Sequence, residues 1–334
     1  MKTSAGLLLI NKQPGITSFG TLNAIKKAFY PAKIGHTGTL DKFAGGLLLV
    51  LVGRAVKLAP WFSGADKEYE GTIRFGLETD TLDPEGSPVA SADLPSRERL
   101  EEALPRFRGH ILQRPPAYSA VHIGGERAYK LAREGSLRDM PERPVVIHAL
   151  ELRSWEPPFA SIRVRCSKGT YIRSLARDIA LAAGSRGHLA ALTRTGIAGF
   201  SLKEALYPGE AGLPEGLRPP GPEVFETLGI PCLLVDRESA RRIGQGKALE
   251  PLIDEGKLTL GGLPFVDQSL TPPGGEPLSA AVFYPSPEGV ELGAMIVKKA
   301  GKWTYGYVYA AACSGGPVAD PLSGGGAGGP RGNC

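Results

Sequence analysis

The chain has 334 residues, of which 42% are hydrophobic and 22% charged, and its 39 Lys and Arg outnumber 34 Asp and Glu for a net charge of +5. This composition is typical of a folded globular protein of about two domains, and the absence of any apolar run of about 18 residues excludes a transmembrane helix. The opening apolar run, Leu7–Ile10, is too short for a signal peptide, and four scattered cysteines with no C-x-x-C pair favour a reducing cytoplasm over a disulfide framework or a cysteine zinc site.

The first elements follow from apolar runs and turn residues. Leu7–Ile10 predicts a buried strand that stops at Pro14-Gly15. Thr17 or Ser18 can cap a helix that ends before Pro31, because the apolar residues between them have helical spacing. The other elements expected before residue 64 are a Gly-rich loop at 34–46, a strand at 47–52 and a helix at 54–63.

Alternation and amphipathic spacing place the next elements. Residues 68–75 alternate and predict a strand, and the turn-rich stretch of about 79–96 predicts an exposed acidic insertion. A helix is expected at 97–104, with strands at 145–152 and 161–166. Residues 170–183 predict an amphipathic helix with Arg173 and Arg177 together on its polar face.

Strands and helices mixed without a regular βαβ repeat indicate an α+β fold with a mixed, largely antiparallel sheet flanked by helices. We expect this fold to form one large domain over residues 1–207, followed by a Pro- and Gly-rich linker over 208–231. Alternating apolar segments over 232–312 predict a small β-rich domain. The Gly-rich residues 313–334 have little to bury and predict a disordered tail.

Positive charge is concentrated in two segments. Residues 1–60 hold eight Lys or Arg against one acid, Asp41, and residues 161–200 hold seven against Asp178. If the two segments share a face they form a polyanion-binding surface, whose affinity would fall steeply with salt. The alternative is an ordinary solvated set of basic side chains.

The loop Gly35–Gly46 places one histidine, His36, and one carboxylate, Asp41, between glycines. Glycines allow close approach of the backbone to a ligand, and a carboxylate among many cations suits a nucleophile or base acting on an anionic substrate. Asp41 can equally be a turn residue that accepts backbone hydrogen bonds, and His36 a surface residue.

Other chemistries lack their motifs. The sequence has no G-x-x-x-x-G-K-[ST], G-x-G-x-x-G, G-x-S-x-G or H-E-x-x-H pattern. Neither basic segment supplies the paired carboxylates of a glycosidase. We therefore expect no metal and no redox cofactor.

Six segments within about residues 5–200 carry recognisable motifs: Gly6–Ser18, Gly35–Asp41, Asp66–Glu70, Thr79–Gly86, Pro116–Ala120 and Cys166–Arg173. Together, and in this order, they resemble the TruB family of tRNA pseudouridine synthases. One departure is Lys42-Phe43, because the family usually has Pro after the aspartate.

The resemblance implies that the chain isomerises a uridine in the T loop of tRNA, conventional position 55, to pseudouridine after flipping it out. It implies catalytic roles for Asp41 as the nucleophile, Tyr69 as the ring that stacks on the base and Arg173 as the partner that orients Asp41. The substrate-binding residues that it implies are His36, Tyr171, Leu192, Lys12, Tyr118 and Lys168.

The resemblance also implies a cytoplasmic, monomeric enzyme that binds the T-arm stem-loop without cofactor, membrane or obligate protein partner. Two other functions stay open: a non-catalytic tRNA-binding or folding chaperone on the same scaffold, and a small-molecule hydrolase. For residues 232–312 the alternatives are an RNA-binding domain and a packing domain without RNA contact.

Overall fold

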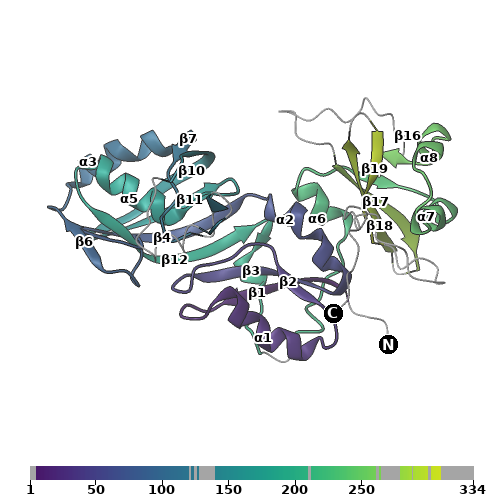
Figure 1. The fold of residues 1–334 in the computed structure, drawn as a ribbon, viewed down its shortest axis with the longest axis horizontal. Helices are drawn as coiled ribbons and strands as arrows, with labels where there is room; N and C mark the ends of the chain where they lie inside the picture. Colours follow the sequence, from purple (N-terminus) through teal and green to yellow (C-terminus); the bar gives the residue numbers. More distant parts are fainter. Residues whose placement is uncertain are drawn as a thin grey trace, which may run out of the picture. The chain divides into compact units, whose positions relative to one another are not determined.

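The computed structural model describes residues 5–119, 122–123, 126–127, 140–209, 212–260, 263–264, 279–287, 289–299 and 302–309. The chain divides into two compact units, Met1–Pro219 and Pro220–Cys334 (Figure 1). The tail predicted at 313–334 lies outside the described residues. Within the described part of the chain, no helix is long and apolar enough to cross a membrane.

The described part of unit 1 is built on a nine-stranded mixed sheet in which all pairings are antiparallel except that between β3 and β12. This confirms the predicted α+β class with a largely antiparallel sheet. The sheet order is β1 (Gly6–Lys12), β3 (Gly45–Val52), β12 (Gly187–Ile197), β4 (Lys67–Phe75), β11 (Phe159–Cys166), β10 (Arg143–Glu156) and β7 (Gly109–Gln113), with β2 (Ile34–His36) on β3 and β13 (Phe200–Ser201) on β12.

Burial explains the two kinds of strand. Every residue of β3 is buried, because α1 covers one face of its end of the sheet and other chain segments cover the rest, so β3 reads as a continuous apolar run. By contrast, β4 and β11 alternate between buried and exposed residues, with Ile162, Val164 and Cys166 of β11 facing inward as predicted.

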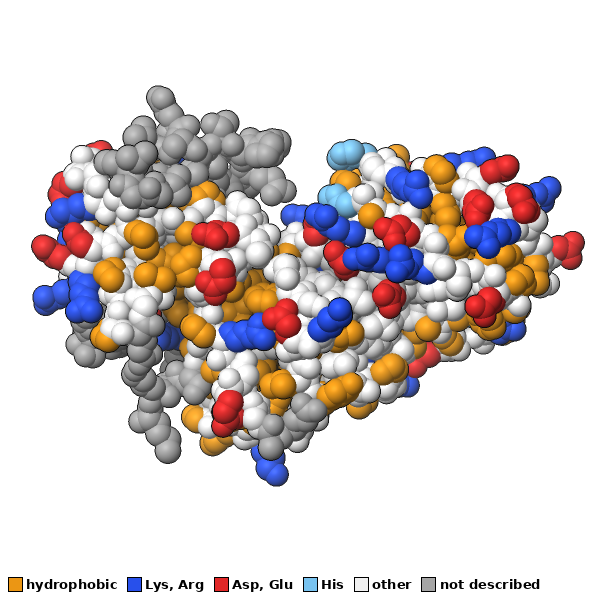
Figure 2. All heavy atoms as spheres, turned by 180° about the vertical axis from the view of Figure 1, so that it is seen from behind, with side chains coloured by type: hydrophobic (Ala, Val, Ile, Leu, Met, Phe, Trp, Pro, Cys, Tyr) orange, Lys and Arg blue, Asp and Glu red, His pale blue; other side chains and the backbone are white. Residues whose placement is uncertain are grey.

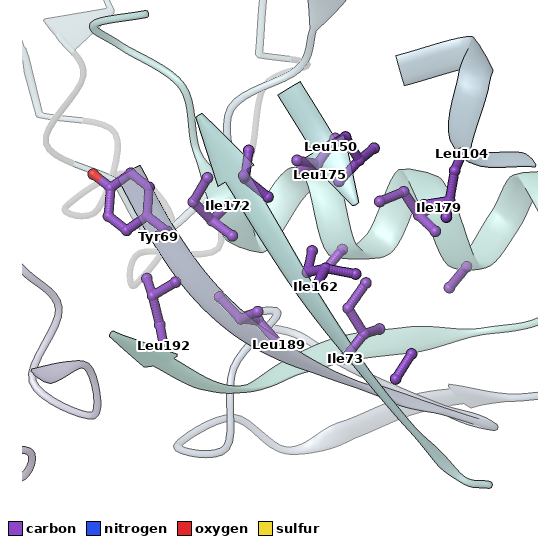
Figure 3. Close-up of a cluster of buried hydrophobic side chains, with 14 of the residues drawn as sticks. Tyr69, Ile73, Leu104, Leu150, Ile162, Ile172, Leu175, Ile179, Leu189 and Leu192 are labelled. Atoms are coloured by element: carbon purple, nitrogen blue, oxygen red, sulfur yellow. The ribbon is translucent and has the colours of Figure 1, made fainter. Parts of the chain in front are cut away.

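Helices cover the sheet in two places. Thr17 accepts a hydrogen bond from Gly20 N and caps α1 (Ser18–Ala28), whose apolar face packs on β1 and β3. The apolar face of α5 (Ile172–Ala182) packs on β4, β11 and β12 together with α3 (Arg97–Ala103) (Figure 3). The remaining short elements are α2 (Ala59–Ser63), 3₁₀ turns at Gly53–Leu58, Leu104–Phe107 and Leu202–Glu204, and the strand pairs β5 (Leu77–Thr79) with β6 (Pro88–Ser91) and β8 (His122–Ile123) with β9 (Glu126–Arg127).

Two segments predicted as a linker and an exposed insertion make specific contacts that composition does not indicate. The expected linker at 208–231 is mostly structured: Leu213 is buried in the α1 core, and Arg218 pairs with Leu7 beside the sheet. The insertion expected at 79–96 is exposed over most of its length, but it buries Leu82 and Asp83. In both cases apolar or paired side chains among the turn residues supply contacts that composition alone conceals.

Unit 2 is a small β-rich domain, as predicted, and its described residues include three short helices. Its described sheet has six strands, and its core joins residues of β14, β17 and β18 to α7 and α8. The strand order is β16 (Leu263–Pro264), β15 (Thr259–Leu260), β14 (Cys232–Leu234), β17 (Ser279–Ser286), β18 (Gly289–Lys299) and β19 (Lys302–Val308), and the helices are α6 (Pro222–Thr227), α7 (Arg237–Gly244) and α8 (Glu250–Asp254).

Candidate active site

The Gly-rich loop that carries Asp41 joins β2 to β3, and side chains of other elements hold it by hydrogen bonds to its backbone. The Ser18 hydroxyl, at the start of α1, donates to Leu40 O (3.0 Å) and accepts from Leu40 N (2.9 Å). The residue just before Asp41 therefore has both of its backbone groups tied to one buried side chain. This positions the Asp41 backbone without using its carboxyl group.

Lys12 holds the other side of the loop. Its side chain is fully buried, and Nζ donates to Ala44 O (2.5 Å), Gln13 O (3.2 Å) and Lys42 O (3.4 Å). Burial lowers the pKa of Lys12 to about 8, although the charge of Asp41 acts in the opposite direction. In this structure the Lys12 ammonium group anchors the loop, and substrate binding by Lys12 stays a prediction.

Arg173, at the start of α5, links Asp41 to a second carboxylate. Nε lies 2.9 Å from Asp41 Oδ2 and Nη2 donates to Oδ1 at 3.4 Å, while Nη1 lies 3.2 Å from Asp83 Oδ2. Nη1 and Nη2 also donate to the carbonyl oxygens of Thr81 (2.8 Å) and Tyr118 (3.1 Å). The expected pairing of Arg173 with Asp41 is thus present in the structure.

Arg173 was predicted on the polar face of this helix, yet its side chain is only 7% exposed. The reason is Asp83, which is 8% exposed and supplies a buried counter-charge from the loop between β5 and β6. Asp83 is itself fixed by the Thr81 hydroxyl and by Glu85 N, both of which donate to its Oδ1. The sequence analysis missed Asp83, although it stands in the Thr79–Gly86 motif.

Asp41 combines restricted solvation with an adjacent cation. Burial raises the pKa of its carboxyl group and the nearby Asp83 acts in the same direction, whereas the Arg173 guanidinium lowers it. The side chain is still 39% exposed, in contrast to Arg173 and Asp83. The Asp41 carboxylate is therefore oriented by a buried charge network but remains accessible. Such a carboxylate can attack a bound molecule or remove a proton from it.

Tyr69 and Leu192 form an apolar wall beside this carboxylate. Tyr69 on β4 is 9% exposed and Leu192 on β12 is 8% exposed, and both belong to the core cluster under α5. Figure 3 shows the two side chains at one end of the cluster, with the Tyr69 hydroxyl pointing away from it. Burial raises the pKa of Tyr69, so this ring is a neutral phenol that can present a face to a planar group.

His36 lies at the end of β2, three residues of loop before Leu40, and is half-buried. Gly38 N donates to His36 Nδ1 (3.4 Å), which leaves the ring proton on Nε2 when the ring is neutral. Burial and the charge of Arg194 lower the pKa of His36 and favour that neutral form. His36 can therefore donate one hydrogen bond from Nε2.

Tyr171 is held through its backbone by a residue that sequence reasoning missed. The buried amide of Gln113 on β7 donates to Tyr171 O (3.1 Å) and accepts from Tyr171 N (2.8 Å). The Tyr171 side chain is partly exposed at the start of α5. Lys168 is exposed in the preceding turn, and Tyr118 is partly exposed with its carbonyl on Arg173.

Much of the second basic segment is neutralised by acids from elsewhere in the chain. Arg163 pairs with Glu68 (3.1 Å) and Arg186 with Glu78 (3.0 Å). The face in Figure 2 accordingly shows basic and acidic side chains interspersed over unit 1 instead of a continuous basic area. Counting charges by segment overestimated the positive field, because cross-strand partners lie far away in the sequence.

Residues 26–172 match the family model described as TruB family pseudouridylate synthase, N-terminal domain. The tRNA pseudouridine synthase B of Borreliella burgdorferi strain ZS7 is 47% identical over 203 residues, which cover 60% of this chain and 72% of that protein. The chain belongs to the TruB family. The protein of the same name from Francisella tularensis subsp. tularensis is 48% identical over 203 residues, 60% of this chain and 67% of that protein.

Solved structures support the fold of this TruB family member. A crystal structure of a Cbf5-Nop10-Gar1 complex matches with a TM-score of 0.63 at 22% identity, over 91% of this chain and 82% of that one. An H/ACA RNP bound to a substrate RNA containing 2′-deoxyuridine matches with a TM-score of 0.62 at 20% identity, over the same shares of the two chains. At this identity the likeness concerns the fold alone, and it agrees with the α+β architecture described above.

Proposed function

We propose that this TruB family member is a tRNA pseudouridine synthase that isomerises a T-loop uridine, conventional position 55, with Asp41 as its catalytic carboxylate. The observation that carries the proposal is the ion pair between Asp41 and the buried Arg173, which aims a partly exposed carboxylate from a rigid loop. The names of the bacterial relatives supply the tRNA substrate.

Pseudouridine formation asks little of a protein beyond positioning. The bond from ribose C1′ to N1 breaks and a bond from C1′ to C5 forms, while C5 loses a proton and N1 gains one, so no atom is gained overall. Asp41 can assist by attacking C1′, by attacking C6 of the ring or by removing the C2′ proton. No cofactor is required, and we expect the chain to act as a monomer without a partner protein.

The surrounding residues fit the intermediate stages. A uridine in a folded loop must leave its stack, at a cost of a few kcal/mol, before Asp41 can reach it. We expect Tyr69 to stack on the extruded base, with Leu192 and Tyr171 beside it. His36 is placed to donate from Nε2 to the nucleotide, and exposed Lys168 to approach a phosphate.

The proposal is tested with a T-arm RNA in which only one uridine is retained, and product is read by mass after labelling with a pseudouridine-selective reagent. We expect product with the wild type and with Asp80→Asn, an exposed aspartate in the neighbouring loop. Asp41→Asn should bind the RNA and form none. Equal product from Asp41→Asn would refute the assigned carboxylate, and binding without product from the wild type would favour the alternative, a chaperone.

A further inference from the structure

Arg194 is among the largest fully buried side chains of the protein, at 1% exposure. It has no role among the site residues described so far. It lies on β12, the strand that joins the β1–β3 part of the sheet to the β4–β11 part. Removing a guanidinium group from water costs free energy unless the group is hydrogen-bonded. The hydrogen-bond partners of Arg194 therefore indicate its role.

The strand register places Arg194 where the two parts of the active site meet. It pairs in register with Tyr69 on β4 in the antiparallel direction and with Gly46 on β3 in the parallel direction. Residues directly opposite in an antiparallel pair project their side chains on the same face, so the Arg194 side chain shares a face with the Tyr69 ring. Gly46 has φ +101°, and a Cβ there would lie 2.4 Å from Arg194 O.

The guanidinium group donates hydrogen bonds to backbone carbonyls on both sides of Asp41. Nε donates to Leu47 O (2.7 Å), just after the loop, and Nη2 donates to Gly38 O (3.1 Å), three residues before Asp41. Arg194 also acts on the Tyr69 hydroxyl, whose pKa it lowers against the larger effect of burial. One rigid planar group therefore spans the loop of the carboxylate and the ring on the neighbouring strand.

No described carboxylate forms an ion pair with Arg194, so its charge is balanced mainly by carbonyl oxygens of the active-site loop. That charge also acts on neighbouring groups. After burial, it is the next cause that lowers the pKa of His36. It also opposes protonation of Lys12, after burial and against the charge of Asp41.

We propose that Arg194 is a positioning residue of the reaction, which sets the distance and angle between the Asp41 carboxylate and the Tyr69 ring. The inference rests on the proposed pseudouridine synthase function. Because Arg194 has almost no exposed surface, it acts through these two groups and not by contact with RNA. A small displacement of a catalytic group can cost about 100-fold in rate, which is the effect expected when the planar fork is lost.

The test compares the wild type with Arg194→Lys, which keeps the charge but loses the fork. The matched control is Arg108→Lys. Arg108 is an exposed arginine that also donates to a backbone carbonyl of this sheet, from Nε and Nη2 to Leu150 O. Each protein is measured for kcat and KM on the T-arm RNA, for RNA affinity by filter binding and for Tm. We expect kcat of Arg194→Lys to fall about 100-fold with RNA affinity unchanged within about twofold, while Arg108→Lys behaves as the wild type.

Arg194→Met is the second variant, because replacing a buried charge by an apolar side chain of similar length often leaves folding intact. It should lose kcat at least as strongly, and the pKa of His36, followed by NMR, should rise in Arg194→Met but not in Arg194→Lys. Wild-type kcat in a folded Arg194→Lys or Arg194→Met would overturn the inference, as would a loss that follows RNA affinity alone. Failure of the wild type to form pseudouridine would instead refute the proposed function.

Discussion

Replacing Asp83 by alanine tests how the buried Arg173 is stabilised. The Asp83 carboxylate accepts hydrogen bonds from the Thr81 hydroxyl (2.5 Å), from Glu85 N (3.0 Å) and from Arg173 Nη1 (3.2 Å). All three bonds end on an ionised carboxylate, and a hydrogen bond to a charged group contributes about 1.5–3 kcal/mol. Removing one partner of a buried ion pair costs about 3–5 kcal/mol, a range that already includes the loss of such bonds.

We expect the lower end, about 3 kcal/mol, because Arg173 keeps Asp41 and two carbonyl acceptors after the change. For a unit of this size, each kcal/mol shifts Tm by about 2–4 °C, so Asp83→Ala should lower the unit 1 transition by about 6–12 °C. Calorimetry or thermal denaturation followed by circular dichroism measures this shift. Activity should fall as well, because Arg173 loses one of the contacts that aim it at Asp41.

Two variants give this experiment its controls. Asp80→Ala removes an exposed aspartate of the same loop that accepts one hydrogen bond, from Ser87 N (2.9 Å), and should cost about 1 kcal/mol or less. Asp41→Asn should leave stability at pH 7 unchanged or higher, because burial raises the pKa of Asp41 and the ionised form is therefore less favourable in the folded chain than in the unfolded chain. If Asp83→Ala cost no more than Asp80→Ala, Asp83 would not be the main counter-charge of Arg173.

Three further outcomes follow from the site. Because burial raises the pKa of Asp41 above its ordinary 3.8, kcat should fall on the acid side at a pH above that value, and a plateau that continued down to pH 4 would contradict this. Burial lowers the pKa of Lys12 from 10.5 to about 8, so its contribution to stability should increase as pH rises from about 8 to 10.5; unfolding measured across this range should lose that increment in Lys12→Met. Gly46→Ala should destabilise more than Gly15→Ala, because both glycines have positive φ but only Gly46 faces backbone atoms within 3 Å, and equal denaturation midpoints would argue against close packing of β3 on β12.

Much of the fold follows from local pattern. The alternation at 68–75 predicted β4, observed at Lys67–Phe75, and the helical spacing at 170–183 predicted α5, observed at Ile172–Ala182. These elements have one buried face each, and a buried face leaves a periodic trace in the sequence. The contacts within 79–96 and 208–231 were not predicted, because a few specific contacts leave no periodic trace in the sequence.

Most site residues could be predicted from short motifs, whereas the contacts of the buried cations could not. Asp41, His36 and Tyr69 stand in short recognisable segments, whereas Lys12 and Arg194 act on backbone carbonyls, which every segment of chain provides. No spacing rule can indicate such a partner. The burial of Arg173 depends on Asp83, 90 residues away, so periodicity placed this arginine on the polar face of its helix.

The buried cations explain why Asp41 can be the exposed member of the site. Lys12 and Arg194 direct their donors at the backbone of the Asp41 loop, and Arg173 shares its donors between Asp83, two carbonyls and Asp41. The loop is therefore held by its main chain, and the Asp41 side chain is not required to hold it. A carboxylate freed from that structural duty can change its protonation state or its bonding partner during a reaction while the loop keeps its shape, which is what preorganisation of a catalytic group requires.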